Sequence, residues 1–416
     1  MARILVHTLV FAPDGVSTSQ IVSELAHDLH DYEHKVVVLT TQPHYNRDLD
    51  AEAQQPLQRR LFGLYYTSQY HGIRVIHTRM RRKADRVSGR FSDYLIFHAL
   101  SLILAAFLIG RQDAVLSVSP PLTIGVIGWL LTLIKGGKAI YNVQEIYPAV
   151  MVQTGMLTEE SRLYPILKRI ERFVYRTSQV IVPISDGFKA TIIAEGIAPG
   201  KVVTIPNFVD TEFICPQPKD NELSRELKLL DKYVVLYAGN IGITQSFDMI
   251  IEVMGRLADH PHIHFLIVGD GARRVQLETL IGEKRFPNVT MLPYQPRHVV
   301  PNIYATGDLH LVPLMAGTAR TTIPSKIYTI MASGRPALVS VDHDSELVSV
   351  VQSANCGLAT PPDDADALKT AILRAYAERE TFQQYGANGR RYIEQHYSRK
   401  AVSAQYDRLI RQLTNG

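Results

Sequence analysis

The feature that most constrains the fold is a regular alternation of short, β-branched segments with amphipathic helical ones. The first half of the chain contains the segments ARILVHTLV, KVVVLTT, GIRVIHT, DAVLSVS, KAIYNVQ and QVIVPIS, separated by stretches with helical periodicity such as TSQIVSELAHDLHDY. The alternation restarts later with YVVLYAGN, HFLIVGDG, NVTMLPY, DLHLVPL, RPALVSV and CGLATP. Strands that alternate with helices in this way form parallel, doubly wound sheets. The sequence therefore predicts two α/β domains in tandem.

The boundary between these domains is predicted where the alternation breaks. The segment KVVTIPNFVDTEFICPQP contains three prolines and an asparagine, which favour an irregular connection. We expect a first domain over residues 1–203, a linker over 204–218 and a second domain over 219–385, with a helical tail over 386–416. A chain of 416 residues is long enough for two domains.

Composition excludes several classes of protein. The net charge of +4 is too small to indicate nucleic-acid binding. The two cysteines, Cys215 and Cys356, lack metal-ligand spacing and are expected to be reduced. The N-terminus enters a strand at once, so we expect no signal peptide and a cytoplasmic protein. The apolar run 94–110 contains His98, and a membrane span there would separate strands that belong to one sheet.

A basic segment precedes that apolar run. Residues 79–90 (RMRRKADRVSGR) contain six Lys or Arg and one Asp. Basic residues beside an apolar helix are typical of a segment that lies on an anionic membrane surface, and on this interpretation residues 79–110 attach the protein peripherally to the inner face of the plasma membrane. A solvated basic loop beside a buried core helix is the alternative, and the sequence leaves both open.

Glycine turns follow several predicted strands. In FAPDGVSTSQ, Gly15 allows a tight turn or the close approach of a ligand, and the hydroxyls of residues 17–19 are placed to cap the next helix. A turn with a capped helix and no ligand is the alternative. Two further turns occur in YAGNIGITQ and LIVGDG. Because open parallel sheets bind ligands beyond the carboxyl ends of their strands, the three turns together predict a cleft lined with backbone amides.

A lysine stands at an unusual place in TTIPSKIYTIMASGRP. Pro324 favours an extended entry and Ser325 a helix N-cap, so Lys326 lies at the start of a helix. A cation is unfavourable at a helix N-terminus unless an anion binds there, and a diphosphate would supply that anion. Arg320 is a candidate second cation. A side chain that merely extends into solvent is the alternative.

Together these motifs resemble a known family. The ordered segments FAPDGVSTSQ, EHKVVVLTT, NVQEIYP, VIVPIS, VVTIPNFVDTEF, YAGNIG, LIVGDG and PSKIYTIMASGRP are similar to family 4 glycosyltransferases of the GT-B fold, and most of all to the branch that builds bacterial surface polysaccharides. The resemblance implies two Rossmann-like domains that face a central cleft, with the 386–416 helix crossing back to the first. It also implies a retaining transferase that takes a sugar from a nucleotide-diphosphate donor and gives it to a glycan or lipid-linked acceptor.

The resemblance assigns roles to particular residues. Gln144 and Glu145 stand beside the reacting sugar, and Glu145 would orient or deprotonate an acceptor hydroxyl. The residues that it places at the donor diphosphate are Lys326, Arg320, Gly15, Asn240 and Gly242. Those that it places at the nucleoside are Gly269, Gly271 and Thr329.

Two departures from the family pattern bear on activity. Asn240 and Gln245 occupy places where many relatives carry cations, which indicates that Lys326 replaces them. Thr321 and Thr329 occupy the places of a glutamate pair, which leaves ribose binding and donor identity open and makes a weakened or inactive enzyme an alternative. An active enzyme is the favoured interpretation, because Lys326 and the glycine turns are present.

No cofactor or metal is expected besides the nucleotide-sugar substrate. The acidic residues of PPDDADALKTAI are interpreted as the first turn of a helix and not as metal ligands. The alternatives to a transferase are a non-catalytic partner subunit that binds a nucleotide sugar and a GT-B sugar-nucleotide epimerase. A glycosidase is not expected, because the sequence offers no pair of cleft carboxylates to serve as acid and nucleophile.

Overall fold

The computed structural model describes residues 1–45, 49–80, 87–318 and 324–415. The chain divides into two compact units, Met1–Asn207 with Arg399–Gly416, and Phe208–Ser398. The division falls after Asn207, inside the segment 204–218 that was interpreted as the linker. Each unit has one sheet, and the two sheets are described separately below.

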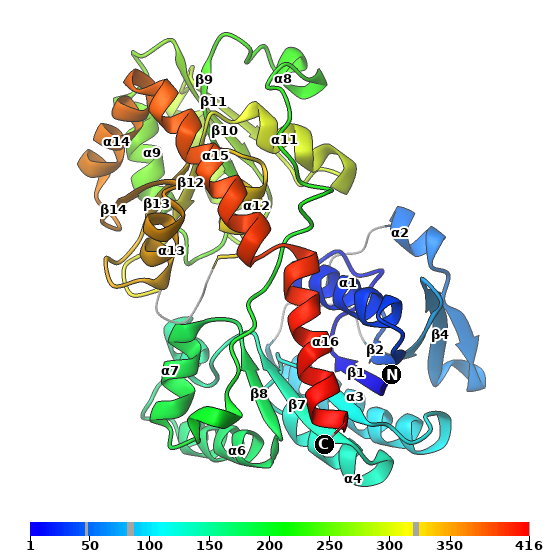
Figure 1. The fold of residues 1–416 in the computed structure, drawn as a ribbon. Coiled ribbons are helices and arrows are strands. Elements are labelled where there is room, and N and C mark those ends of the chain that lie inside the picture. Colours follow the sequence, from blue (N-terminus) through cyan, green and yellow to red (C-terminus); the bar gives the residue numbers. More distant parts are fainter. Residues whose placement is uncertain (46–48, 81–86, 319–323, 416) are drawn as a thin grey trace. The chain divides into compact units, whose positions relative to one another are not determined.

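The first unit is built on an eight-stranded sheet of order β3-β4-β5-β2-β1-β6-β7-β8. From β5 to β8 all neighbours are parallel, and helices cover both faces (Figure 1). The predicted doubly wound architecture is therefore confirmed. The strands are β1 (Arg3–Thr8), β2 (Lys35–Thr41), β3 (Gln58–Arg60), β4 (Tyr65–Tyr70), β5 (Ile73–Thr78), β6 (Ala114–Val118), β7 (Lys138–Val143) and β8 (Val180–Pro183).

The helices of the first unit pack their apolar faces on this sheet. Leu104 and Ala105 of α3, for example, share a buried cluster with Leu5 and Leu39 of the central strands. The helices are α1 (Ser17–Asp31), α2 (Leu49–Gln54), α3 (Val87–Leu108), α4 (Ile124–Lys135), α5 (Ala149–Gln153), α6 (Leu163–Thr177), α7 (Asp186–Ala194) and α16 (Arg399–Asn415), with short 3₁₀ turns at η1 (Leu61–Gly63) and η2 (Pro199–Lys201).

One edge of the first sheet differs from the sequence-based prediction. Strands β3 and β4 are antiparallel, and β4 forms a hairpin with β5. At the tip of this hairpin, His71 and Gly72 both have positive φ, 45° and 81°. Two-residue turns between twisted antiparallel strands require positive φ at these positions. The segment YYTSQYHGIRVIHT carried this signal through its aromatic residues and its glycine, and the prediction used only its second half.

The second unit has a six-stranded parallel sheet of order β11-β10-β9-β12-β13-β14. The order reverses between β9 and β12, and this is the switch point at which such sheets bind ligands. The strands are β9 (Tyr233–Ala238), β10 (Ile263–Val268), β11 (Val289–Leu292), β12 (Leu309–Pro313), β13 (Ala337–Ser340) and β14 (Gly357–Thr360). The helices are α8 (Glu222–Glu226), α9 (Phe247–Arg256), α10 (Arg274–Lys284), η3 (Arg297–Val299), α11 (Val300–Thr306), α12 (Lys326–Ala332), α13 (Glu346–Ala354), α14 (Ala365–Ala377) and α15 (Arg379–His396).

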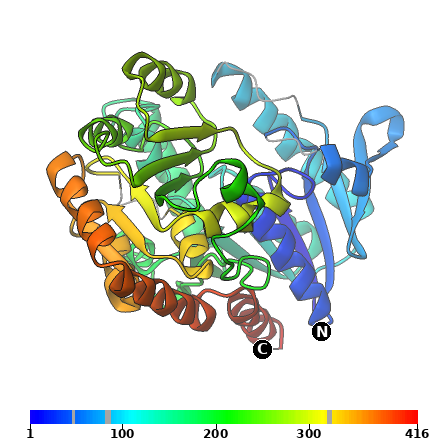
Figure 2. The same cartoon turned by 90° about the horizontal axis from the view of Figure 1, so that it is seen from above.

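The tail forms two helices where one was expected from residue 386. Helix α15 belongs to the second unit, and only α16 belongs to the first, where it packs on α1 (Figure 2). Two glycines allow α15 to approach closely, since a Cβ on Gly386 would lie 2.2 Å from the Gly334 carbonyl oxygen, and one on Gly389 would lie 3.0 Å from Cys356 Cβ. The guanidinium of Arg390 then binds the carbonyls of Thr211, Ile214 and Ala332, so α15 is held to the second unit.

Helix α3 contains the apolar run. No helix within the described ranges is both long and apolar enough to cross a membrane. One side of α3 is buried in the first unit, including Phe97 and Leu104, whereas Ile103 and Phe107 are exposed by 49% and 85%. Residues 81–86 of the basic segment 79–90 lie outside the described part of the chain.

Candidate functional site

The switch point of the second sheet brings a glycine turn and a lysine together. Strand β9 ends at Ala238 and is followed by Gly239, whose φ is +138°. Lys326, the first residue of α12, lies against this turn, because a Cβ added to Gly239 would lie 3.3 Å from Lys326 Nζ. A side chain at residue 239 would therefore cover the ammonium. The structure thus brings together two sites that lie far apart in the sequence.

The environment of Lys326 is unusual for a cation. Its Nζ is inaccessible to solvent and has no hydrogen-bond partner among the described residues, although the side chain as a whole is partly exposed. The Nζ atom lies 3.8 Å from the centroid of the Tyr237 ring, which supplies a cation–π contact. Burial lowers the pKa of Lys326 to about 7. Nζ of Lys326 is therefore a buried amino group that forms no ion pair with any residue the structure describes.

Packing, and not capping, positions this lysine. Ser325 is the N-cap residue of α12, but its side chain makes no capping hydrogen bond. The helix is anchored instead by five buried residues, Ile327, Tyr328, Ile330, Met331 and Ala332. Sequence reasoning missed Tyr237, which lies beneath the ammonium and donates a 2.5 Å hydrogen bond to the Asn240 carbonyl. The aromatic residue just before the glycine turn in VLYAGN was the available signal.

The predicted nucleoside glycines have a packing role that the structure makes plain. A Cβ on Gly269 would lie 1.9 Å from the Gly239 carbonyl oxygen, and one on Gly271 would lie 2.5 Å from the Ile241 carbonyl oxygen. Both residues also have positive φ, 154° and 153°. Only glycine lets the turns after β9 and β10 press together in this way. Contact of these glycines with a nucleoside stays a prediction.

The remaining predicted donor residues fall into three cases. Gly242 donates its amide to Gln245 Oε1 over 2.8 Å, so this turn is closed by its own side chain. Thr329 is paired with the buried hydroxyl of Tyr304. Arg320 and Thr321 lie outside the described residues. The structure therefore places Lys326, Asn240 and Gly242 around one strand-end region and leaves the second cation undecided.

In the first unit, the turn after β1 is built around Asp14. Its carboxylate is buried and accepts 3.0 Å hydrogen bonds from the amides of His44 and Tyr45. This holds the loop that carries Gly15 to the loop after β2. Helix α1 begins at Ser17 with Val16 as its N-cap residue and without a side-chain capping bond, so the expected hydroxyl cap is not observed.

Gln144 lies just beyond β7, and its amide is fully engaged. Its Nε2 donates to Asn142 Oδ1 over 2.6 Å and to Asn207 Oδ1 over 3.1 Å, while its Oε1 accepts from Asn207 Nδ2 over 2.8 Å. Asn207, from the IPNF segment, was not singled out from the sequence. This reciprocal pair fastens the end of the first unit to its strand-end region, which favours a positioning role for Gln144.

Glu145 has the properties of a reactive carboxylate. It is partly buried, and burial raises its pKa, an effect opposed by a hydrogen bond from Tyr147. The pKa of Tyr147 is also raised, mainly by burial and to a smaller extent by the negative charge of Glu145. A carboxylate with a raised pKa beside a strand end is suited to accept a hydrogen bond or a proton from a hydroxyl group.

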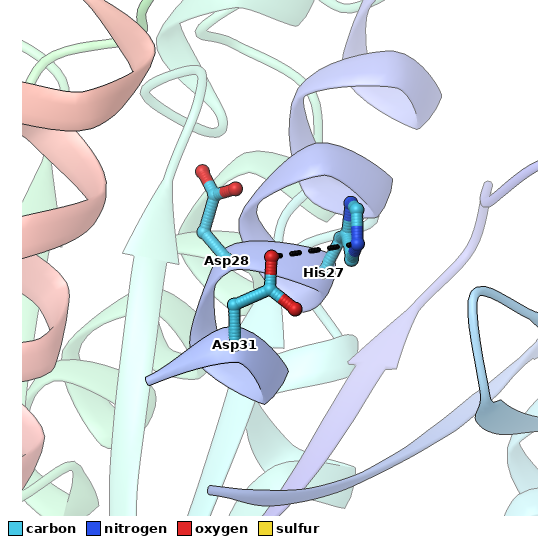
Figure 3. Close-up of side chains that lie close together, drawn as sticks. All are labelled: His27, Asp28 and Asp31. Carbon is cyan, nitrogen blue, oxygen red and sulfur yellow. Dashed lines mark ion pairs between the residues drawn. The ribbon is translucent and has the colours of Figure 1, made fainter. Parts of the chain in front are cut away.

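One group of residues within the described ranges has metal-type composition, namely His27, Asp28 and Asp31 of α1 (Figure 3). Figure 3 shows His27 directed toward Asp31, and their ion pair is 3.5 Å long. Asp28 is already bound by the Arg399 guanidinium over 2.6 Å and by the Ser403 hydroxyl over 2.6 Å. The Asp28 carboxylate therefore fastens α16 to α1.

The acidic cluster of the second unit is also structural. Asp364 is the N-cap of α14 and accepts from the Ala367 amide over 2.9 Å, and Asp366 lies in the first turn. The interpretation of this cluster as a helix start is confirmed.

Sequence comparisons identify related proteins over nearly the whole chain. The family model described as glycosyl transferases group 1 matches residues 218–392, and that described as glycosyl transferase 4-like domain matches residues 18–207. The putative colanic acid biosynthesis glycosyl transferase WcaI of Escherichia coli is 24% identical over 426 aligned residues, which cover 98% of this chain and 100% of WcaI. The probable glycosyltransferase WbjE of Pseudomonas aeruginosa is 26% identical over 67% of this chain and 72% of its own length.

Solved structures share the fold over the full length. The sucrose-phosphate synthase of Thermosynechococcus elongatus superposes with a TM-score of 0.78 at 18% identity, covering all of both chains. The Anabaena protein HepE, solved in complex with UDP and glucose, gives a TM-score of 0.74 at 14% identity over 99% of this chain and 100% of its own. WaaG, a glycosyltransferase of lipopolysaccharide biosynthesis, gives 0.69 at 15% identity over 99% of this chain and 100% of its own.

Proposed function

The chain is a GT-B glycosyltransferase of the family 4 and group 1 type, and from this we propose that it transfers a sugar, with retention and without a metal ion, from a nucleotide-diphosphate donor to a glycan or lipid-linked acceptor in the synthesis of a cell-surface polysaccharide. The second unit binds the donor and the first unit binds the acceptor.

The observation that carries this proposal is the Lys326 ammonium. A buried cation without a hydrogen-bond partner costs free energy of folding, and such groups persist where function requires them. A diphosphate is the anion that the family's donors would bring to it. Charge-assisted hydrogen bonds from Nζ to phosphoryl oxygens would then return the free energy lost on burial.

The chemistry follows from these groups. The bond between the anomeric carbon and the donor's phosphate oxygen breaks, and Lys326 stabilises the negative charge that develops on the leaving diphosphate. The acceptor oxygen bonds to the anomeric carbon on the same face, and its proton passes to the departing phosphate oxygen. Glu145 accepts a hydrogen bond from the acceptor hydroxyl and so orients it for attack. No covalent sugar–enzyme intermediate is needed in this sequence.

We propose that no metal ion is needed because the protein itself supplies a positive charge to the donor diphosphate. In metal-dependent transferases a divalent cation neutralises the diphosphate, whereas here a side-chain ammonium stands at the switch point. Transfer assayed with a chelator should therefore proceed at the same rate as transfer with added Mg²⁺. A rate that falls with the chelator and returns with the metal would contradict this part of the proposal.

The donor site is tested by binding. Isothermal titration calorimetry of the full chain against UDP-, GDP- and ADP-sugars should identify one tight ligand, and Lys326→Met should weaken it by at least 100-fold, as the loss of a buried charge-assisted contact predicts. Lys284→Met is the matched control, because Lys284 lies near an aromatic ring of the same unit but is exposed. If no nucleotide sugar binds the wild-type protein, the donor site is wrong and a purely structural role for the chain becomes the better hypothesis.

The proposed membrane attachment uses the exposed side of α3. Leu95, Ile96, Ile103 and Phe107 are exposed there, and Asp93, the one acidic residue of this helix, is buried. An apolar helix face that follows a basic segment fits a peripheral protein on the anionic cytoplasmic surface. This location would bring the enzyme to a lipid-linked acceptor.

Flotation with phosphatidylglycerol-containing vesicles tests this attachment. The wild-type protein should float with the vesicles, and the double variant Ile103→Glu with Phe107→Glu should not. Val275→Glu is the control, because Val275 is 75% exposed on α10 of the other unit. Equal flotation of both variants, or no flotation of the wild type, would exclude α3 as the attachment surface.

A further inference from the structure

A cavity of about 550 Å³ lies in the second unit, away from the switch-point turns. Its lining includes Tyr233, the first residue of β9, Asp308, which precedes β12, and Arg335, which precedes β13. Because these strands are parallel, their first residues lie at one end of the sheet, and the turns that follow their last residues lie at the opposite end. The cavity is therefore a different site from the one that contains Lys326 and Gly239.

The lining is positively charged on balance. It includes Lys219, Lys232, Arg335 and Arg379 against two carboxylates, Asp231 and Asp308. Lys219 is neutralised by Asp308, which lies 2.5 Å from its Nζ.

The other three cations form no ion pair within the described part of the chain. They donate hydrogen bonds to backbone carbonyls, and the Arg379 guanidinium also lies 4.4 Å from the centroid of the Tyr376 ring. Lys232 Nζ lies 2.7 Å from the Pro261 oxygen, Arg335 lies 2.6 Å from the Ala305 oxygen, and Arg379 lies 3.0 Å from the Tyr376 oxygen. Carbonyls orient these groups but do not cancel their charge. The cavity therefore offers three cations to an anion.

Tyr233 gives an independent sign of a ligand. The residue is 6% exposed, and its hydroxyl has no hydrogen-bond partner among the described residues. The residue lines the cavity, and the charges of Asp308 and Arg379 both act on its hydroxyl. A buried hydroxyl that loses its water without gaining a partner destabilises the fold. A ligand oxygen would supply the missing partner.

We propose that this cavity binds a small phosphorylated sugar. Its volume lies within the ordinary range for small-molecule sites, which is about 300–1,000 Å³. The phosphoryl group would bind Arg379, Lys232 and Arg335. The sugar hydroxyls would bind Tyr233 and the Asp231 carboxylate. The carboxylate beside the cations favours a ligand that carries hydroxyl donors next to its phosphate over a bare anion.

Calorimetry of the full chain with glucose and mannose monophosphates tests this proposal, with glucose and inorganic phosphate as the separate halves of the ligand. At least one hexose monophosphate should bind more tightly than either half. Tyr233→Phe, which removes one oxygen atom, should weaken binding about fivefold, and Arg379→Gln about tenfold or more. Arg391→Gln is the matched control, because Arg391 lies on the same helix, is exposed and does not line the cavity.

Several outcomes would overturn the proposal. No binding of any hexose monophosphate would exclude the site. Binding of phosphate alone with equal affinity, unchanged in Tyr233→Phe, would reduce it to an adventitious anion site. Binding that is lost in Lys326→Met and kept in Tyr233→Phe would place the ligand at the donor site. Because the cavity and the donor site share no residue, failure here leaves the proposed transferase function intact, and the reverse also holds.

Discussion

The six parallel strands of the first unit follow the same order as the six strands of the second unit, but the two units differ in how the polar groups at their strand ends are hydrogen-bonded. In the first unit, the amide of Gln144 is bonded on both sides by Asn142 and Asn207. In the second unit, Nζ of Lys326 has no partner in the part of the chain that the structure describes. The hydrogen-bonded Gln144 network stabilises the first unit at its strand ends, whereas the Lys326 ammonium, without a hydrogen-bond partner, is available to an anionic ligand. This difference supports the proposal that Lys326 supplies the donor-binding charge and that Gln144 acts as a positioning residue.

The largest expected effect comes from Lys326→Met. Loss of the buried ammonium should lower kcat/KM for transfer by about 1,000-fold, since both donor binding and leaving-group stabilisation depend on it. The same change should raise the melting temperature by a few degrees, because it removes a desolvation cost of about 1–3 kcal/mol.

The rise in stability should depend on pH with a definite sign. The folded-state pKa of Lys326 is lowered to about 7, below its value of about 10.4 in the unfolded chain. Protonation of Lys326 therefore lowers the free energy of unfolding of the wild-type protein by its full amount below pH ~7. This destabilisation decreases as the pH rises and is absent above pH ~10. The gain in melting temperature should shrink over this range, and a gain that does not change with pH would show that Nζ is not the cause.

The next largest effect is expected from Glu145→Gln. A neutral amide accepts a weaker hydrogen bond than a carboxylate and orients the acceptor hydroxyl less strongly, so kcat should fall by about 100-fold. Donor affinity should stay within about twofold, because Lys326 is untouched. Rates from a single-turnover assay and affinities from calorimetry separate the two effects, with the exposed Glu160→Gln as control. A large change in donor affinity would move Glu145 into the donor site.

A smaller effect is expected from pH on donor affinity. Nucleotide-diphosphate sugars bind the charged form of Lys326, whose pKa in the free protein is about 7. Binding should raise that pKa, so above pH ~7 each binding event takes up a proton and the affinity falls by up to about tenfold per pH unit. Calorimetry in two buffers of different ionisation enthalpy measures the proton uptake. Affinity that is flat between pH 7 and 9 would mean that Lys326 stays charged without a ligand.

The smallest effect is expected from Asn207→Ala. It leaves the Gln144 amide without one donor and one acceptor, so the free energy of unfolding measured in urea should fall by about 1 kcal/mol. Transfer activity should change by less than about fivefold, as befits a positioning residue. A loss of activity of 100-fold with unchanged stability would mean that the Gln144–Asn207 pair contacts a substrate, and the contrast between the two units would then fail.

Much of the architecture follows from local patterns. Runs of β-branched residues between amphipathic segments predicted both parallel sheets, and the prolines after residue 204 marked the segment in which the units divide. Strands β3 and β4 were missed because their residues are mostly polar and aromatic, and they lack the continuous apolar run that is typical of a buried parallel strand. The tail was predicted as one helix because the break at Tyr397 and Ser398 leaves the helical periodicity almost intact.

The sequence by itself determined the fold class, the glycine turns and the presence of a lysine after β12, since each depends on spacing along the chain. Only the tertiary structure decided which of these residues share an environment. Burial, the Tyr237 ring beneath Lys326 and the close contact of the Gly239 and Gly269 turns all join residues from separate strands. The cavity with the unpartnered Tyr233 hydroxyl arises in the same way. Desolvation and partner geometry depend on three-dimensional packing, and no local pattern encodes them.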